Sequence, residues 1–410
     1  MTGTRAHAAH LALATAERLL DPAVINGSSL ADGLAGTALL HARLSAVDPV
    51  FVDAARRHWE LAARNAREKP DEGHGIFASP AGIATSLILG TPYLPDPDQE
   101  TPATGRAVRW LSRRATRIAA QAQARRQAGH PLSSWADYDL INGPAGTGRI
   151  LLAALIAGHT DAEPGLTATL TTLTAMITSS ADLPGWWIPA TVSSGVKLHS
   201  SGEAATGIAH GIAGPLALAA KAHAAGYTVP RQETAIRTAA DWLLHWQSDR
   251  GWAPAVTGTE LASGISDPMP GRRDAWCYGI PGIASALALA GQALGDQRLT
   301  ASGQASLRTL ASRHPRDWDT EGPTICHGYA GVLQATARAR TSITAHAAQQ
   351  LTAAFNPEYA FAFRHHGNGT QADHPGLLTG ASGIALVLAD YGNLPSAEVP
   401  APWDSVLLLA

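Results

Sequence analysis

A short Gly-x-x-Gly phrase recurs along the whole 410-residue chain, and an apolar run follows most copies. Glycine accepts tight-turn geometry and lets neighbouring backbones approach closely, so each phrase predicts a turn that opens a helix. The second copy has Ser79 in place of its first glycine. The seven copies are GLAGTALL from Gly33, SPAGIATSL from Ser79, GPAGTGRILL from Gly143, GIAGPLALA from Gly211, GIPGIASALAL from Gly279, GYAGVLQAT from Gly328 and GASGIALVLA from Gly380.

Two kinds of helix are expected to alternate along this repeat. The runs after the phrases are apolar on most sides, which is typical of helices inside a core. The segments between phrases have one charged face and apolar residues at helical spacing, which predicts outer helices. Four such segments are Asp53 to Glu68, Arg106 to Arg126, Arg231 to Asp249 and Asp296 to Ser312.

Repeated helix pairs bury their faces against neighbouring pairs, and seven pairs can do so by closing into a ring. The sequence therefore predicts an all-α fold in which residues 1–410 form a single domain. This domain is an α/α toroid with about seven inner and seven outer helices. Because the inner helices of a ring point the same way, their glycine turns should gather at one end.

Composition limits the classes of function. Hydrophobic residues make up 45% of the chain and charged residues 15%, which suits a large helical core. A net charge of −3 is unlike the basic domains of nucleic-acid binders, so we exclude nucleic acid as a partner. Charged residues interrupt the first 20 positions, and the apolar runs fall short of the roughly 20 residues of a membrane span. We expect a soluble, cytoplasmic protein without a transmembrane segment.

Both cysteines stand two residues before the first glycine of a turn, Cys277 in the fifth and Cys326 in the sixth. With His327 they offer two thiolates and one imidazole, a ligand set that suits one Zn²⁺ per chain and leaves a fourth position open. The spacing is not that of a zinc finger, so a disulfide or two unrelated buried thiols are the alternatives. The shared repeat position favours a central zinc site.

The fourth turn contributes a candidate acid–base group. His210 stands directly before the first glycine, at the repeat position that Tyr278 and His327 occupy in later turns. Imidazole exchanges protons near neutral pH, which suits general acid–base catalysis. A hydrogen-bonded structural histidine is the alternative, but the repeat position directs His210 to the end of the ring where the turns gather.

A carboxylate in the third turn, DYDLING, could orient that histidine. Asp137 and Asp139 both stand in this segment, and either could do so. Capping of a helix N-terminus by Asp139 or Asn142 is an alternative role for this segment.

The strings DYDLING, AHGIAG, RRDAWCYGIPG, ICHGYAG and HPGLLTGASGIAL, in this order and spacing, resemble the lanthionine synthetase C-like (LanC) family of class I lanthipeptide cyclases. The resemblance spans nearly the whole chain and implies an α/α toroid around a zinc ion. By resemblance, the zinc ligands fall on Cys277, Cys326 and His327, the acid–base histidine on His210, the arginine on Arg273 and the tyrosine on Tyr278. The aspartate falls on Asp139, with Asp137 as its rival. Without the resemblance, Arg273 would be interpreted as a surface residue beside Arg272 and Asp274, and Tyr278 as a packed aromatic.

The resemblance also implies an activity and partners. Zinc-activated cysteine thiols of a dehydrated precursor peptide, leader plus core, would add to dehydroalanine or dehydrobutyrine and close lanthionine or methyllanthionine rings. A dehydratase, export machinery and peripheral association with a membrane biosynthetic complex would accompany this activity. The alternatives are addition of an external thiol such as glutathione and a non-catalytic, zinc-stabilised peptide-binding scaffold. Prenyl transfer would favour an Asp-Cys-His ligand set, which this chain lacks.

Two segments have features that the repeat does not explain. Residues Lys197 to Glu203 lack the aromatic-rich phrase expected of the family, which suggests that they shape the substrate. Arg106 to Arg126 carries seven arginines and no acidic residue, so it predicts either a solvated helix face, the favoured interpretation, or a dock for an acidic leader peptide. No segment is predicted to form a small β-rich addition to the ring.

Overall fold

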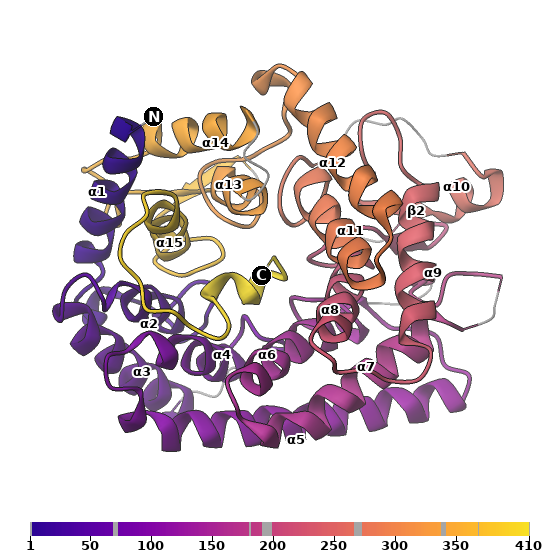
Figure 1. The fold of residues 1–410 in the computed structure, drawn as a ribbon, viewed down its shortest axis with the longest axis horizontal. Coiled ribbons are helices and arrows are strands. Elements are labelled where there is room, and N and C mark those ends of the chain that lie inside the picture. The colour runs from indigo at the N-terminus through magenta and orange to yellow at the C-terminus, as the bar shows by residue number, and fades with distance from the viewer. Residues whose placement is uncertain are drawn as a thin grey trace.

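The computed structural model of the protein describes residues 2–68, 73–179, 182–190, 199–265, 273–337, 342–367 and 369–409. Within these ranges, the helices form two concentric layers around a central axis (Figure 1).

The inner layer consists of the helices that follow the seven glycine phrases. Each begins one or two residues after the first residue of its phrase, as the sequence predicts. These helices are α2 (Leu34–Leu44), α4 (Ala81–Gly90), α6 (Pro144–Ile156), α8 (Ala213–Ala224), α11 (Ile280–Leu294), α13 (Tyr329–Thr336) and α15 (Ala381–Tyr391).

The outer layer has one partner for each inner helix in the part of the chain that the structure describes. These helices are amphipathic to different degrees and pack their apolar sides on the inner layer. They are α1 (Thr2–Arg18), α3 (Val50–Glu68), α5 (Thr101–Gln127), α7 (Glu163–Ile177), α9 (Gln232–His245), α12 (Gln297–Ser312) and α14 (Ser342–Ala353).

The inner layer closes on itself. Each inner helix contacts the inner helix on either side, and the contact of α15 with α2 joins the last repeat to the first. The first helix, α1, packs on α15, so the start of the chain completes the outer layer (Figure 1). The predicted α/α toroid is confirmed.

Backbone hydrogen bonds link successive turns at one end of the ring, which we call the mouth. Donors and acceptors are the residues two positions before the first residue of each phrase. Amide-to-carbonyl bonds run from Ala209 to Cys277 (3.2 Å), Cys277 to Cys326 (3.2 Å), Cys326 to Leu378 (3.0 Å), Leu378 to Ala31 (2.9 Å) and Ala31 to Phe77 (3.1 Å). Equivalent positions of the repeat therefore become neighbours in space.

The second glycine of each phrase is needed for close packing. A Cβ at Gly383 would lie 1.9 Å from the carbonyl oxygen of Leu377, and a Cβ at Gly331 would lie 2.0 Å from that of Ile325. In both cases the oxygen belongs to the residue six positions earlier, because the turn folds back on the first turn of its own helix. A side chain at these positions would push the turn away from the helix.

The C-terminal segment fills the centre of the ring. The short 3-10 helix Trp403–Leu407 lies inside the inner layer in Figure 1 and contacts α6 and α4. The indole of Trp276 donates to the carbonyl of Leu407 at 3.0 Å, and the guanidinium of Arg149 donates to the hydroxyl of Ser405 at 2.6 Å. The inner helices are thus packed against a plug rather than around an open channel.

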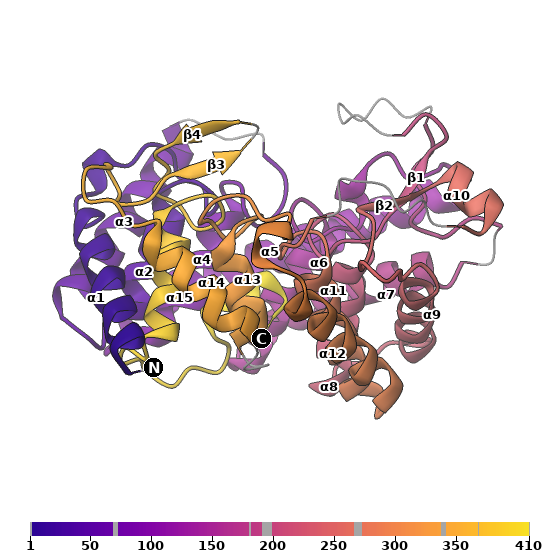
Figure 2. The ribbon, with the colours of Figure 1, turned by 90° about the horizontal axis from the view of Figure 1, so that it is seen from above.

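Two small antiparallel strand pairs were missed by the sequence analysis. β1 (Glu203–Ala205) pairs with β2 (Ala255–Thr257), and β3 (His365–Gly367) pairs with β4 (Thr370–Ala372). A six-residue helix, α10 (Gly258–Ser263), follows β2. Figure 2 shows both strand pairs on the same side of the ring, which is its upper side in this view. Strands of three residues are too short to show a periodicity of two.

One predicted helix is shorter than expected, and one segment singled out in the sequence is described only in part. The predicted helix from Arg231 to Asp249 ends at His245, because the chain then enters a tight turn in which Ser248 and Gly251 exchange backbone hydrogen bonds. Of the unusual segment from Lys197 to Glu203, the first two residues lie outside the described ranges, and Glu203 opens β1. Among the described residues, no helix is both long and apolar enough to cross a membrane.

Candidate metal centre and catalytic site

Cys277, Cys326 and His327 converge at the mouth of the ring. Their ligand atoms all lie within 4.8 Å of one another. Cys277 lies in the turn before α11, and the adjacent Cys326 and His327 lie in the turn before α13. On a regular helix, adjacent side chains diverge by about 100°. Because α13 begins only after the extended residue Gly328, both side chains can face one point.

This triad fits a zinc ion. Zinc–sulfur bonds of about 2.3 Å and zinc–nitrogen bonds of about 2.0 Å at tetrahedral angles place ligand atoms about 3.5–3.8 Å apart. The separations in the triad lie within 4.8 Å, so small side-chain movements would bring it to that geometry. Both cysteines are free thiols, and the disulfide alternative is not formed.

The two thiols are electrostatically linked. The pKa of Cys277 is lowered because its thiolate accepts a hydrogen bond from Cys326, and His327 adds to this effect against the cost of burial. The pKa of Cys326 is raised because it lies beside that thiolate and is itself buried from water. Without a cation, the pair therefore holds one negative charge more readily than two. A divalent metal supplies the charge that stabilises two thiolates together.

His210 and Asp139 form a close pair beside the triad. His210 Nδ1 lies 2.6 Å from Asp139 Oδ2, and the backbone N–H of Asn142 donates to Asp139 Oδ1 at 2.8 Å. Asp139 is fully buried. Burial raises the pKa of Asp139, and the hydrogen bond with His210 limits that rise. Asp139 thus both orients the imidazole and accepts a backbone hydrogen bond in its own turn.

Asp137, the rival carboxylate, has other partners. Its Oδ2 accepts the backbone N–H and the hydroxyl of Ser133, and its Oδ1 pairs with Arg125 at 2.5 Å. With Ser134 it also forms a capping box at the short 3-10 helix Trp135–Asp137. The geometry therefore gives Asp137 a capping role and leaves Asp139 as the partner of His210.

Tyr278 is next to Cys277 in the chain and close to the ring of His210. Its ring centroid is 6.3 Å from that of His210. Burial raises the pKa of Tyr278 well above its usual range, and the nearby Cys277 and Asp139 reinforce the shift. The phenol therefore remains a hydrogen-bond donor at neutral pH.

Arg273 is half-buried and held by acidic residues of the sixth repeat. Its Nη1 lies 2.9 Å from Glu321 Oε2 and 3.8 Å from Asp319 Oδ1. Its charge also interacts with Cys277. The neighbouring Asp274 is buried and pairs instead with Arg313 at 2.5 Å, and Arg272 lies outside the described ranges. Arg273 is therefore part of the mouth rather than a free surface residue.

Sequence reasoning missed two aromatic neighbours of these groups. The ring of Trp135 is 5.1 Å from that of His210, and the ring of His365, in β3, is 5.2 Å from that of His327. The repeat located only residues next to the glycine phrases. Trp135 lies eight residues before its phrase, and the β3–β4 hairpin that contains His365 was not predicted. Nothing in the sequence therefore indicated either contact.

The sequence profile described as "Lanthionine synthetase C-like protein" matches residues 24–408. The chain belongs to the lanthionine synthetase C-like family. This LanC-like chain is 26% identical over 190 residues to "Nisin biosynthesis protein NisC" of Lactococcus lactis subsp. lactis. That match covers 45% of this chain and 44% of the relative, so it spans less than half of NisC.

The LanC-like chain also resembles a solved structure, nisin cyclase, in its fold. The TM-score is 0.74, at 20% sequence identity, and the match covers 98% of this chain and 96% of the other. At this identity the likeness establishes the shared α/α toroid.

Proposed function

We propose that this LanC-like protein is a zinc-dependent lanthipeptide cyclase. In the reaction, a cysteine thiol of a dehydrated precursor peptide adds to a dehydroalanine or dehydrobutyrine of the same peptide and closes a thioether ring. The main support is that the acid–base pair and the thiol–imidazole triad share one mouth. The amide of Ala209, next to His210, donates directly to the carbonyl of Cys277.

Cys277, Cys326 and His327 would hold the metal, one ion per chain, and leave a fourth coordination position open. Zinc bound there would lower the pKa of a substrate thiol and supply a sulfur nucleophile at neutral pH.

His210 would move the proton that the reaction transfers. Forming the carbon–sulfur bond breaks the π bond of the dehydroamino acid, and the thiol proton ends on the α-carbon, so the reaction consumes no co-reactant. With Nδ1 held by Asp139, the Nε2 atom of His210 is the nitrogen that can take a proton from the thiol or give one to the α-carbon. Asp139 would orient the ring and stabilise its protonated form.

Arg273 and Tyr278 would act on the electron-rich intermediate. Addition of sulfur places negative charge on the peptide carbonyl oxygen next to the α-carbon. A guanidinium or a protonated phenol aimed at that oxygen would lower the barrier. Arg273 is held in position by Glu321, so little side-chain freedom would be lost when it engages the substrate.

A precursor peptide with leader and core is the substrate that this proposal requires. A dehydratase must supply its dehydroamino acids, and export machinery would remove the cyclised product. Cytoplasmic location, with peripheral attachment to a membrane complex, is part of the same proposal.

The proposal is tested by incubating the zinc-loaded protein with a dehydrated precursor and then adding a thiol-alkylating reagent. Ring closure should remove alkylatable thiols without changing the peptide mass before alkylation. Addition of an external thiol would instead increase the mass by that of the thiol. If the peptide thiols stay fully alkylatable while the protein carries zinc, the cyclase proposal is wrong.

A further inference from the structure

A pocket with a volume of about 410 Å³ lies between the C-terminal halves of α5 and α7 and the chain from 183 to 189. This volume is within the range of small-ligand sites. None of the triad or acid–base residues lines it, so it is a separate feature from the candidate catalytic site.

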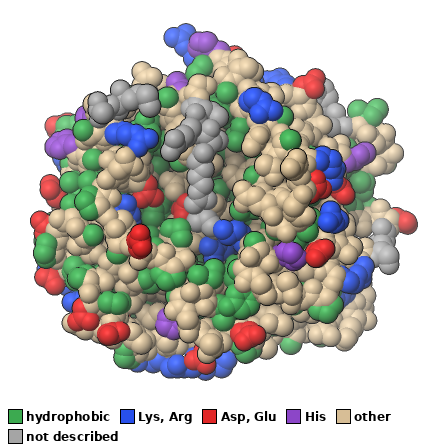
Figure 3. Space-filling view, viewed as in Figure 1, with side chains coloured by type: hydrophobic (Ala, Val, Ile, Leu, Met, Phe, Trp, Pro, Cys, Tyr) green, Lys and Arg blue, Asp and Glu red, His purple; other side chains and the backbone are tan. Residues whose placement is uncertain are grey.

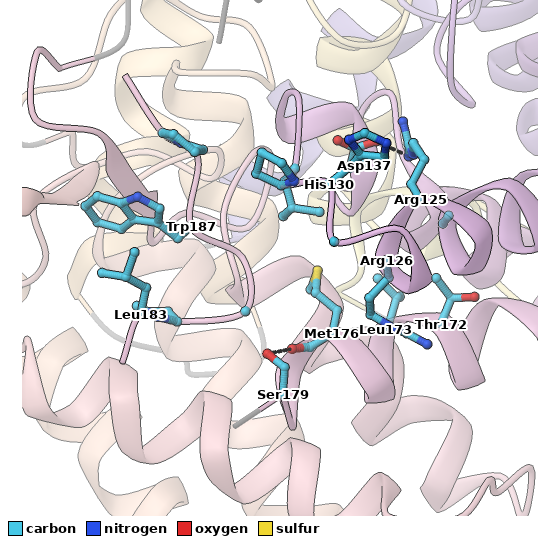
Figure 4. A pocket seen from close by; sticks show the side chains of 17 residues that line it. Arg125, Arg126, His130, Asp137, Thr172, Leu173, Met176, Ser179, Leu183 and Trp187 are labelled. Carbon is cyan, nitrogen blue, oxygen red and sulfur yellow. Dashed lines mark hydrogen bonds and ion pairs between the residues drawn. The ribbon is translucent and has the colours of Figure 1, made fainter. Parts of the chain in front are cut away.

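The pocket combines an apolar part with a basic end. Figure 4 shows Trp187 and Leu183 at one end, Arg125 and Arg126 at the other, and Met176 between them. Leu183 is 44% exposed, which is unusual for a leucine in a protein with so large a core. A ligand that covers Leu183 would remove this apolar surface from water.

Arg126 supplies the uncompensated charge of the pocket. Arg125 pairs with Asp137, the carboxylate of the pocket wall. Arg126 makes no ion pair with any residue that the structure describes. Lys and Arg side chains also gather at the lower edge of the face in Figure 3, where α5 lies in Figure 1. A carboxylate is the group that such a site attracts.

One short chain segment links the wall of the pocket to the acid–base pair. His130 and Asp137 line the pocket, Trp135 packs on His210, and Asp139 binds His210. Two residues of extended chain span at most about 7 Å, so Asp137 and Asp139 connect the pocket to the site directly. A peptide held in the pocket would have its continuing chain close to His210.

We infer that this pocket binds a segment of the substrate peptide in which a large apolar side chain stands next to an Asp or Glu. The apolar side chain would lie on Leu183, Met176 and Trp187, and the carboxylate would meet Arg126. The identity of the peptide as the substrate rests on the proposed cyclase function, whereas the chemistry of the segment rests on the pocket alone. Arg125 stays paired with Asp137, and the arginines of α5 outside the pocket keep the solvated role that the sequence favours.

Fluorescence anisotropy with the full-length protein tests this inference without requiring turnover. The probes are three fluorescein-labelled octapeptides that alternate Leu with Asp, Leu with Lys and Ser with Asp. We expect the Leu–Asp peptide to bind at least about tenfold more tightly than the other two, since each lacks one of the two interactions. Equal binding of the Leu–Asp and Leu–Lys peptides, or of the Leu–Asp and Ser–Asp peptides, would overturn the inference.

Matched variants locate the binding. Arg126→Glu should weaken the Leu–Asp peptide about tenfold and favour the Leu–Lys peptide, whereas Arg117→Glu, about 13 Å away along the same helix, should change neither. Leu183→Asp should also weaken the Leu–Asp peptide, but Val24→Asp, at an exposed apolar residue outside the pocket, should not. If each variant behaves like its control, the pocket is not the binding site. Binding without ring closure would contradict the cyclase proposal and leave the pocket inference intact.

Discussion

His210 Nδ1 and Asp139 Oδ2 lie 2.6 Å apart, although 71 residues separate them in the chain. A carboxylate can only accept a hydrogen bond, so Nδ1 carries the proton and Nε2 is left for proton exchange. Leu140, next to Asp139, donates its amide to the carbonyl of Ala209, next to His210, at 3.1 Å. The pairing of adjacent turns thus sets the position of both side chains.

Asp139→Asn keeps the shape of the side chain but removes its charge. We expect kcat for ring closure to fall by about 10²–10⁴-fold, because the imidazole loses its fixed orientation and the stabilisation of its charged form. Steady-state kinetics with a dehydrated precursor measures this. Asp161→Asn, at an exposed carboxylate that pairs with Arg109, is the matched control and should change kcat by less than about twofold. Equal losses in the two variants would show that Asp139 has no special role.

Gly383→Ala should destabilise the fold by about 1–3 kcal/mol or more, because its Cβ would lie 1.9 Å from the carbonyl oxygen of Leu377. Gly105→Ala, in the second turn of α5, meets only the flexible end of Arg109 at 3.4 Å, so we expect it to stabilise the protein by up to about 1 kcal/mol. Urea unfolding of both variants provides the comparison. Similar midpoints for the two would disprove the packing role of the second glycine.

The glycine repeat made much of this architecture predictable. Because Cys277 and Cys326 share a repeat position, the sequence placed them together, and the structure joins them by a backbone hydrogen bond. The same reasoning from the repeat position predicted that His210 lies at the mouth. The assignment of Asp139 over Asp137 needed the family resemblance, since both carboxylates stand in one turn.

Other features could not be predicted, because they depend on how distant segments meet. The contact of Arg273 with Glu321 requires the loops of the fifth and sixth repeats to lie side by side. The segment Trp403–Leu407 carries neither a repeat phrase nor an apolar periodicity in the sequence, and only the closed ring gives it a cavity to fill. Trp135 contacts His210 from a 3-10 turn, and a turn of three residues has no sequence periodicity from which it could be predicted.

Trp403→Ala tests the role of the C-terminal plug. The side chain is almost fully buried, and its indole donates to Asp390 Oδ2 at 2.8 Å. Truncation should leave a cavity and an unpaired acceptor and reduce the free energy of unfolding by about 3–5 kcal/mol. Val24→Ala, at a side chain that is 50% exposed, should cost less than about 0.5 kcal/mol in the same urea titration. A loss below about 1 kcal/mol for Trp403→Ala would mean that the plug contributes little.

His41 should make stability depend on pH. Burial, with a contribution from the neighbouring His58, lowers the pKa of His41 from 6.5 to about 3. Between these values the unfolded chain binds more protons than the folded one, so the contribution of His41 to stability is complete above pH 6.5 and is lost as pH falls. Between pH 6.5 and 4.5 the loss is on the order of 2–3 kcal/mol.

Comparison with His41→Gln isolates this effect, because glutamine can still donate to the carbonyl of Leu19 but does not titrate. Urea unfolding at several pH values should show the wild type losing stability faster than the variant below pH 6.5. Parallel pH profiles for the two proteins would rule out His41 as the source.

The zinc content of the purified protein tests the metal centre most directly. Elemental analysis should find one zinc per chain in the wild type and in His210→Ala, because His210 is not a ligand, and none in Cys326→Ala, which removes one of three protein ligands. A wild-type protein that takes up no zinc under reducing conditions, or a Cys326→Ala variant that keeps one zinc per chain, would contradict the proposed site.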